Sequence, residues 1–335
     1  MVVTYLAKSH NVCVITGESV SADASRGYRL LCVHTRFRIP HLTFAIMATR
    51  ALVLELTKEK FDVVHIIGNY FSAPLALAAR MAHVPLIVQT IAGMEAVRIR
   101  HPVMGIPIWG SLRLVHAITA PNRYQSELLS KITGKPVTYI PNGIETIPMV
   151  LSSNNSTFTF CTISRLSKGK RIDLLINAAE ILRKDNCDFR LLIIGDGEER
   201  KRLQQMIRAR GLEGIVVLLG YLPHPVALGI LASADCYVSA SKSEGYGLSF
   251  AEAVSYGKPI IASYFKGIEE LVRDKENGLI ARHPHDLHTL MRSLIDNRDL
   301  LHQLSIGSLR MSRNLRNWKE VSCLYEQFYS TFLRR

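Results

Sequence analysis

Residues 157–197 read TFTFCTISRLSKGKRIDLLINAAEILRKDNCDFRLLIIGDG and contain one complete structural repeat. A short run rich in β-branched and aromatic residues, 157–163, leads through a basic loop into a segment of helical periodicity that begins near Ile172. A second apolar run follows at 189–195. This order of strand, helix and strand predicts two parallel strands joined by a helix that covers the sheet. The stretch therefore predicts an α/β fold.

The same alternation continues along the whole chain and predicts twelve strands. They are 11–16, 29–34, 62–67, 85–90, 117–120, 137–140, 157–163, 189–195, 215–220, 235–239, 259–262 and 278–281. The strands fall into two groups of six, as in two Rossmann-like, doubly wound domains. Two such domains joined by one linker would face each other across a cleft, which is the usual place for a ligand.

A cluster of Pro, Gly, Ser and Asn residues from 141 to 157 marks the linker. We expect an N-terminal domain over 1–147 and a C-terminal domain over 155–316. The last segment, 317–335, has apolar and aromatic residues at helical spacing, which predicts a terminal helix that packs through them. Helical spacing also starts at Val2, before any strand. We therefore expect the first domain to lack the leading strand and Gly-rich loop that open this type of domain.

The composition favours small anionic partners over nucleic acid. The chain of 335 residues has 41 Lys and Arg against 28 Asp and Glu, a formal charge of +13. This excess is dispersed, +7 before residue 150 and +6 after it, without a basic tail. Such a pattern gives little support to nucleic-acid binding and agrees with phosphorylated substrates or acidic lipids. The six scattered cysteines have no close pair of metal-ligand spacing, so we expect reduced thiols and a cytoplasmic location.

Two segments leave a membrane contact open. Arg50 and Arg113 interrupt the longest apolar stretches, so no transmembrane span is predicted. The apolar and basic segments 41–56 and 106–115 agree with helices that cover a sheet, and also with helices that lie in a bilayer interface. Peripheral attachment at the inner face of the membrane is therefore one of two interpretations.

The loops after the C-terminal strands should lie close together, because ligands of open α/β sheets bind beyond the carboxyl ends of the strands. The first loop, Ser164-Arg-Leu-Ser-Lys-Gly-Lys-Arg171, leads into a helix whose first N–H groups add to Arg165 and Lys170 as a phosphate cradle. A solvated basic turn would have the same composition. The second loop, Gly195-Asp-Gly-Glu198, permits close backbone approach, and a turn capped by Asp196 would look the same.

The third loop, Ser241-Lys-Ser-Glu-Gly-Tyr-Gly-Leu-Ser-Phe-Ala-Glu252, carries two carboxylates beside a glycine turn. Its glycines allow a tight turn before a helix that begins near Leu248, so free N–H groups can face an anion. Glu244 and Glu252 can both accept hydrogen bonds from hydroxyl groups of a sugar or ribose. Glu252 would also complement the helix dipole if it had no ligand.

This pair of carboxylates, Glu244 and Glu252 with seven residues between them, resembles the signature of the retaining GT-B glycosyltransferases of family 4, the glycosyl transferases group 1. Further stretches resemble that family's motifs in the same order: Pro141-Asn-Gly-Ile-Glu145, Arg165-Leu-Ser-Lys-Gly-Lys170, Gly195-Asp-Gly197, Gly267-Ile-Glu-Glu-Leu-Val272 and Glu276-Asn-Gly-Leu279. The match covers nearly all of 135–335 and is weaker but continuous before it. The resemblance implies the GT-B fold and transfer of a sugar from a nucleoside diphosphate sugar.

The resemblance also implies a role for each matching residue. The candidate catalytic residues are Arg165 and Lys170, which would neutralise the donor diphosphate, and Glu244, which would bind hydroxyl groups of the donor sugar. Glu252 would hold the ribose. The other donor-binding positions would face the sugar and phosphate or border the base: Tyr246, Gly247, Leu248, Gly195 and Tyr221. Neither a cofactor nor a metal is implied, and the sequence has no Asp-x-Asp motif. The terminal helix, 317–335, would cross back to the N-terminal domain.

The sequence departs from the family pattern at several points. In Gln89-Thr-Ile-Ala92-Gly93, Ala92 stands where many members have His. Ser164 replaces a Gly before Arg165, and Lys266 replaces the first of a Gly pair. These changes, together with the missing leading strand and loop, concern catalysis more than donor binding.

Two hypotheses follow from these observations. In the first, the protein is a retaining transferase that moves a sugar to a hydroxyl acceptor, free or lipid-linked, in the synthesis of a glycan, a lipid-linked saccharide or a glycolipid. In the alternative, it is a non-catalytic subunit that binds a nucleotide sugar or a partner protein. A nucleotide-sugar epimerase of the same fold agrees less well, because the whole motif series follows the transferase pattern. The sequence does not give the sugar, the base or the acceptor.

Overall fold

The computed structural model describes residues 1–17, 27–33, 40–68, 72–91, 99, 105–145 and 157–333. The chain divides into two compact units: unit 1 consists of Met1–Gly143 with Arg316–Arg335, and unit 2 of Ile144–Leu315. All twelve predicted strands are present, to within two residues at each end, and each pairs in parallel with its neighbours. The predicted α/β fold is therefore confirmed. The expected domain boundaries at 147 and 155 lie outside the described residues.

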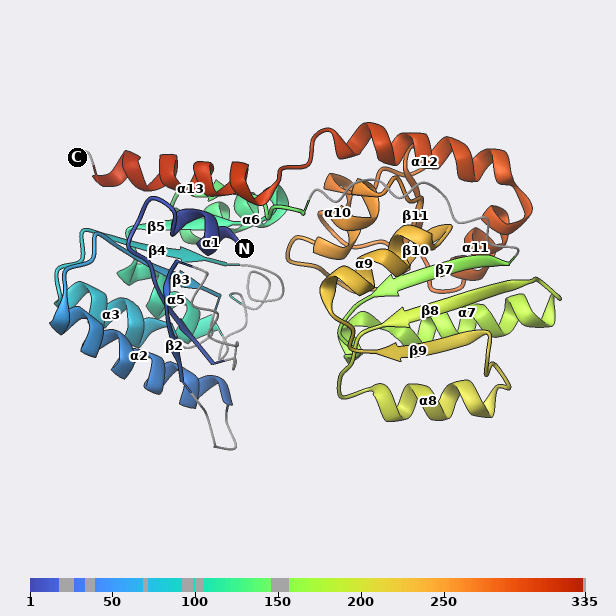
Figure 1. The fold of residues 1–335 in the computed structure, drawn as a ribbon, viewed down its shortest axis with the longest axis horizontal. Helices are drawn as coiled ribbons and strands as arrows, with labels where there is room; N and C mark the ends of the chain where they lie inside the picture. The colour runs from blue at the N-terminus through green and yellow to red at the C-terminus, as the bar shows by residue number, and fades with distance from the viewer. Residues whose placement is uncertain are drawn as a thin grey trace. The chain divides into compact units, whose positions relative to one another are not determined.

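Unit 2 has one six-stranded sheet in the order β12-β11-β10-β7-β8-β9 (Figure 1). Its strands are β7 Phe158–Ile163, β8 Phe189–Ile194, β9 Val216–Gly220, β10 Cys236–Ser239, β11 Ile260–Ser263 and β12 Gly278–Ala281. Its α-helices are α7 Ile172–Lys184, α8 Arg200–Ala209, α9 His224–Ser233, α10 Leu248–Ser255, α11 Asp286–Asp296 and α12 Arg298–Ser312. Single 3₁₀ turns lie at Lys168–Lys170 and Ile268–Glu270. The strand order reverses between β7 and β10, as in a Rossmann-like sheet.

Alternate side chains of each strand in unit 2 enter different cores. Phe158 and Phe160 of β7 pack with α7 and α8 on one face, whereas Cys161 packs with α9 and α10 on the other. The same alternation occurs in β11, where Ile261 faces the first core and Ile260 the second. A strand buried on both faces must be apolar at every position, which explains the continuous apolar runs in the sequence.

Unit 1 has a four-stranded sheet in the order β3-β4-β5-β6 and a separate parallel pair, β1-β2. The strands are β1 Cys13–Thr16, β2 Arg29–Cys32, β3 Val63–Ile67, β4 Leu86–Thr90, β5 Ala117–Ala120 and β6 Val137–Tyr139. The helices are α1 Val2–Leu6, α2 Pro40–Lys58, α3 Ala73–Met81, α5 Gly105–Leu114, α6 Arg123–Thr133 and α13 Trp318–Leu333. Helices α3, α5 and α6 cover one face of the larger sheet, and α13 covers the other.

The terminal helix α13 joins unit 1 through apolar and polar contacts. Val321 and Phe328 are buried against Leu86 and Val88 of β4. His65 of β3 shares a hydrogen bond of 2.7 Å with the Tyr329 hydroxyl through Nδ1, and another of 2.7 Å with Thr90 Oγ1 through Nε2. Burial lowers the pKa of His65 to about 4, because the charged imidazolium would lose its hydration. Neutral His65 is thus part of the contact between the sheet and α13.

His65 should make the stability of the protein depend on pH in a defined window. Its pKa is depressed in the folded state relative to the ordinary value of 6.5. The unfolded chain therefore binds more protons between pH about 6.5 and about 4, and the stabilising contribution is lost as the pH falls through that range. We expect the stability advantage of the wild type over His65→Gln to shrink across this window, by roughly 1–3 kcal/mol. Urea unfolding of both proteins at several pH values measures the difference, and a constant difference would contradict it.

Candidate functional site

Two of the predicted loops meet at the point where the strand order of unit 2 reverses. The loop after β7 and the loop after β10 leave the carboxyl ends of neighbouring strands. The backbone N–H of Lys242 donates to the Gly169 carbonyl at 3.0 Å, and Arg171 Nε donates to the Ala240 carbonyl at 2.7 Å. The structure thus brings the basic loop and the carboxylate loop side by side, at the position where ligands of such sheets bind.

Lys170 and Glu244 form an ion pair at this edge. Lys170 Nζ lies 2.5 Å from Glu244 Oε1, and both side chains are largely buried. Lys170 ends the 3₁₀ turn before α7, and Glu244 lies in the loop before α10. A buried carboxylate is costly unless a cation or hydrogen-bond donors compensate it, and here Lys170 supplies the compensating cation. These two candidate catalytic residues are in direct contact.

Arg165, the third candidate catalytic residue, is oriented differently. Its side chain is 77% exposed, and its Nε lies 3.7 Å from Glu198 Oε2, in the loop after β8. An exposed pair of this kind contributes little to stability, so the guanidinium can exchange this partner for another at low cost. Arg165 is therefore on the same sheet edge, with a partner that the sequence did not indicate.

Gly195 allows the loops after β7 and β8 to touch. Its φ is +129°, and a Cβ at this position would lie 1.9 Å from the Ser164 carbonyl oxygen. A Cβ at Gly197 would lie 2.4 Å from the Leu166 carbonyl oxygen. Only glycine fits such close backbone approach. Asp196 Oδ1 accepts a hydrogen bond of 2.7 Å from the Gly197 N–H within this turn, and Glu199 is the N-cap residue of helix α8.

The start of α10 is fixed by a glycine and a buried tyrosine. Gly247 is the N-cap residue, with φ +84°, and Leu248 and Tyr246 pack partly buried against the core under α9 and α10. The Tyr237 hydroxyl of β10 shares a hydrogen bond of 2.7 Å with Ser249 Oγ in the first turn. The first N–H groups of a helix have no carbonyl acceptor within it, so this end of α10 can accommodate an anion.

Glu252 lies one turn further along α10 and is only 6% exposed. Burial raises the pKa of its carboxyl group, and a hydrogen bond with His224 opposes this shift. The distance from His224 Nε2 to Glu252 Oε1 is 2.7 Å, and His224 Nδ1 lies 3.7 Å from Glu145 Oε2. His224 starts α9, and Glu145 belongs to the stretch Pro141–Glu145. The sequence did not predict His224 or Glu145 as a neighbour of Glu252, because no motif or regular spacing connects these three residues.

The last predicted position, Tyr221, directly follows β9 and is 80% exposed. It lies at the same edge of the sheet as Gly195, whose N–H donates to the Gly220 carbonyl at 2.8 Å. The structure thus places every predicted site residue at the carboxyl edge of the sheet in unit 2. Ala92 and Gly93, where the sequence departs from the family pattern in unit 1, lie outside the described residues.

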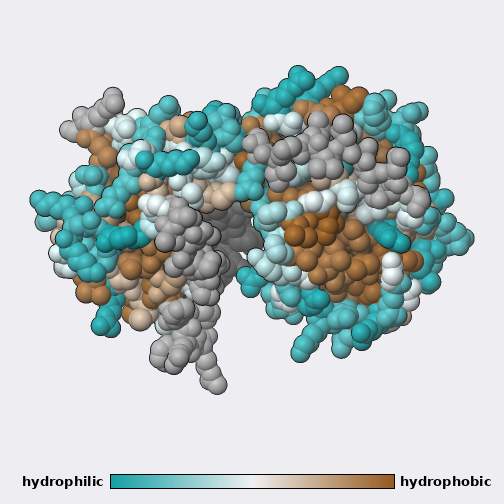
Figure 2. All heavy atoms as spheres, in the orientation of Figure 1, coloured by the Kyte–Doolittle hydropathy of each residue, from teal (hydrophilic) through white to brown (hydrophobic). Residues whose placement is uncertain are grey.

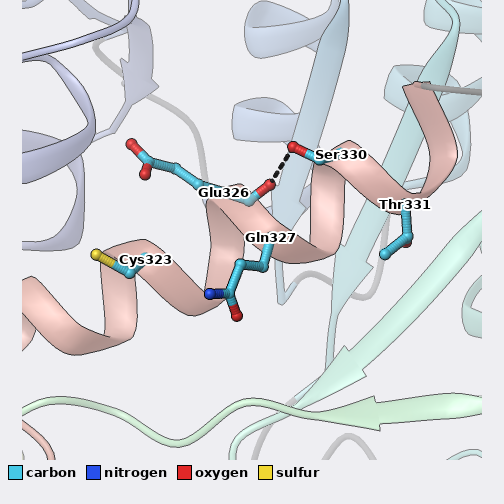
Figure 3. Close-up of a pocket in the computed structure, with 5 residues that line it drawn as sticks. All are labelled: Cys323, Glu326, Gln327, Ser330 and Thr331. Carbon is cyan, nitrogen blue, oxygen red and sulfur yellow. Dashed lines mark hydrogen bonds between the residues drawn. The ribbon is translucent and has the colours of Figure 1, made fainter.

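The pocket drawn in Figure 3 lies elsewhere, along α13. Its lining residues all come from that one helix: Cys323, Glu326, Gln327, Ser330 and Thr331. Ser330 Oγ donates to the Glu326 carbonyl at 2.8 Å, which is an ordinary contact within a helix. None of the predicted site residues lines this pocket, and no cation or glycine loop converges on it. It has no features of an active site.

Neither a metal cluster nor a membrane-spanning helix occurs in the residues that the structure describes. They contain no group of three His, Cys, Asp or Glu side chains placed to hold a metal ion. In the same part of the chain, no helix combines the length and the apolar composition needed to cross a bilayer.

Family models match the two halves of the chain. The model for glycosyl transferases group 1 matches residues 143–309, and the model for glycosyltransferase family 4 matches residues 1–147. These matches, together with the fold, identify a glycosyltransferase of the GT-B class. The chain belongs to the glycosyl transferases group 1, with a family 4 N-terminal domain.

Curated relatives include enzymes that act on lipids. The chain is 23% identical to one subunit of the phosphatidylinositol N-acetylglucosaminyltransferase of Arabidopsis thaliana, over 92% of this chain and 69% of the relative. It is 24% identical to the alpha-monoglucosyldiacylglycerol synthase of Acholeplasma laidlawii, over 78% of this chain and 73% of the relative.

Solved structures share the fold. The structure of HepE from Anabaena in complex with UDP and glucose superposes with a TM-score of 0.81 and 16% identity, over 98% of this chain and 94% of HepE. TarM from S. aureus, in complex with UDP and alpha-GlcNAc-glycerol, superposes with a TM-score of 0.72 and 21% identity. That match covers 84% of this chain, and this chain spans 59% of the length of TarM. These likenesses establish the fold of the chain.

The contact at Gly195 predicts that a single methyl group is strongly destabilising. Gly195→Ala would place a Cβ against the Ser164 carbonyl in a backbone conformation that alanine disfavours, so we expect a loss of about 2–4 kcal/mol in the free energy of unfolding. The matched control is Gly229→Ala in α9, where a Cβ meets open space and we expect a gain of about 0.5–1 kcal/mol. Urea unfolding compares the two variants, and equal effects would contradict the constraint.

The pair His224–Glu252 predicts a measurable titration. Burial raises the pKa of the Glu252 carboxyl more than the hydrogen bond with His224 lowers it, so this group should titrate above the ordinary pKa of 4.5. His224→Ala removes the opposing hydrogen bond and should move the pKa of Glu252 further upward. Carbon-13 NMR of labelled Glu side chains, with Glu252→Gln for assignment, follows this group. Titration at the ordinary value in both proteins would disprove the interaction.

Proposed function

We propose that the protein transfers a sugar from a nucleoside diphosphate sugar to a hydroxyl acceptor, with retention at the anomeric carbon. The observation that carries this proposal is the contact of Lys170 with Glu244 at the carboxyl edge of the unit 2 sheet. A cation and a carboxylate side by side suit the two halves of such a donor, an anionic diphosphate and a hydroxyl-rich sugar. The UDP complexes of HepE and TarM support the choice of donor.

In this proposal the diphosphate competes with Glu244 for Lys170. Phosphate oxygens bring two or more negative charges, so the Lys170 ammonium turns toward them, and Arg165 leaves its exposed pair with Glu198. The N–H groups at the start of α10 add further donors. Glu244, released from Lys170, accepts hydrogen bonds from hydroxyl groups of the sugar. Substrate binding thus replaces the ion pair of Lys170 and Glu244 by two new interactions, Lys170 with the diphosphate and Glu244 with the sugar.

Glu252 is suited to hold the ribose. Its carboxylate is buried and bonded to His224, so ribose hydroxyl groups would meet an acceptor that is already positioned. Backbone groups of Tyr246, Gly247 and Leu248 would face the sugar and phosphate. Gly195 and the exposed Tyr221 would border the base.

Transfer breaks the bond between the anomeric carbon and the diphosphate oxygen, and the nucleoside diphosphate leaves with the electron pair. The acceptor oxygen bonds to the anomeric carbon on the face that the diphosphate occupied, and the acceptor proton is released. Arg165 and Lys170 stabilise the charge that develops on the leaving group. No cofactor or metal is part of this proposal, since the two cations supply the electrostatic stabilisation. Retention rests on the family to which the chain belongs.

A lipid is the acceptor that the relatives favour. The Arabidopsis and Acholeplasma proteins are named for transfer to phosphatidylinositol and for a glucosyldiacylglycerol product. We therefore place the reaction in glycolipid or lipid-linked glycan synthesis, at the cytoplasmic face of a membrane. The six cysteines are free, which supports a reducing compartment.

Charge removal at two positions tests the proposal. Lys170→Met should lower kcat/KM by about 100-fold, because it removes one electrostatic donor to the leaving group. Glu252→Gln should weaken donor binding by about tenfold, because an amide replaces the carboxylate acceptor. Transfer assays and calorimetry with uridine and guanosine diphosphate sugars provide both measurements.

Matched controls come from the same surroundings. Lys168→Met removes an exposed cation of the same 3₁₀ turn, and Glu213→Gln removes an exposed acid of unit 2. Both should behave as the wild type. Normal turnover of Lys170→Met and Glu252→Gln would refute the assignment. Donor binding by the wild type without any transfer would instead identify a non-catalytic nucleotide-sugar-binding subunit.

A further inference from the structure

Three helices of unit 1 carry an exposed apolar surface that the proposed donor site does not use. Seventeen large hydrophobic side chains are exposed in the described residues, and seven of them lie on α2, α3 and α5. They are Ile46, Met47, Val53, Leu54, Leu77, Met81 and Ile106. Met81 is 74% exposed and Ile106 is 67% exposed, so most of each of these two side chains lies outside the core.

The three helices form one continuous layer, because α2 packs on α3 and α3 packs on α5. Their opposite sides are buried through small residues such as Ala48, Ala76 and Ala79. On α2 the exposed residues Ile46, Val53 and Leu54 recur at helical spacing, opposite the buried stripe. Figure 2 shows apolar residues at the surface of this unit where Figure 1 places α2 and α3, with hydrophilic residues among them. We call this layer of α2, α3 and α5 the apolar layer.

The exposed charges of the apolar layer are all positive. The three helices contain a single acid, Glu55, which is buried and pairs with Lys58 and Arg29. Arg50 of α2 and Arg113 of α5 are exposed and form no ion pair in the part of the chain that the structure describes. An apolar surface with unpaired cations and no exposed acid is complementary to an anionic surface with an apolar interior.

We propose that the apolar layer binds the surface of an anionic lipid bilayer. Its apolar side chains would enter the boundary between headgroups and acyl chains, and Arg50 and Arg113 would contact lipid phosphates. A second copy of the chain is a poorer occupant. In a two-fold interface the same patch of both copies is in contact, so Arg50 and Arg113 of one copy would be buried against a surface that carries the same positive charges. The proposal does not depend on the donor site, which lies in unit 2.

Vesicle binding by the full-length protein tests the proposal without any turnover. The protein should cosediment with vesicles of phosphatidylcholine and phosphatidylglycerol, and more weakly with phosphatidylcholine alone. Added salt should release it, because arginine contacts with lipid phosphates are screened. Failure to bind the mixed vesicles at low ionic strength would overturn the proposal.

Two double variants locate the surface. Arg50→Gln with Arg113→Gln should weaken binding to the mixed vesicles by about 20-fold, because each basic residue near an anionic surface strengthens binding several-fold. Leu54→Ser with Met81→Ser should weaken it by at least about tenfold. The control pairs are Lys201→Gln with Arg310→Gln and Ile181→Ser with Ile306→Ser, exposed residues of unit 2. They should bind as the wild type does.

Thermal unfolding shows whether each variant is folded. If Leu54→Ser with Met81→Ser is unfolded, Arg50→Gln with Arg113→Gln still tests the proposal. Equal vesicle binding by the layer variants and the control pairs would overturn the assignment of the surface. Concentration-dependent dimerisation that the serine variant abolishes, without binding to the mixed vesicles, would identify a second copy as the occupant and also overturn the proposal.

Discussion

The close backbone approach at Gly195 is the constraint on which the site of unit 2 depends. The loops after β7 and β8 touch there, with the Ser164 carbonyl where a side chain would otherwise begin. Because β7 also pairs with β10, the loop after β7 is held between both neighbours. The positions of Lys170 and Glu244 follow from this arrangement, since backbone hydrogen bonds such as that from Lys242 N–H to the Gly169 carbonyl join the two loops without using either charge. Backbone packing, more than ion pairing, therefore brings these side chains together.

Both carboxylates of the site, the largely buried Glu244 and the buried Glu252, already have partners. Glu244 has Lys170, and Glu252 has His224. Leaving either carboxylate buried and unpaired would cost several kcal/mol, so a ligand that takes one partner must supply another. A nucleoside diphosphate sugar meets this condition because its phosphates attract Lys170 while its hydroxyl groups donate to the carboxylates. An inorganic anion would attract the Lys170 ammonium but would bring no hydroxyl groups to Glu244, which favours the complete donor over phosphate alone.

The fold was predictable from the sequence because its signals are local. Apolar runs such as 158–163 and the glycine-rich turns occur at the spacing of a repeated strand and helix, and the strand ends were correct to within two residues. The contact of His224 with Glu252 was not predictable, because it joins the first residue of α9 to a residue one turn inside α10, and the two helices share no motif. The orientation of Arg165 also escaped prediction. A long exposed side chain takes its partner from the nearest loop, here Glu198, and that choice depends on packing.

The net charge of +13 did not distinguish phosphorylated substrates from acidic lipids, and the structure suggests why. In unit 2, Lys170 lies among glycine turns and beside a carboxylate, a setting that suits a small ligand with phosphates and hydroxyl groups. In unit 1, Arg50 and Arg113 lie among exposed aliphatic side chains without acids, a setting that suits a broad surface with an apolar interior. A positive charge thus suits a different ligand in each unit. The neighbours of each cation determine which ligand it suits, and the total charge does not record those neighbours.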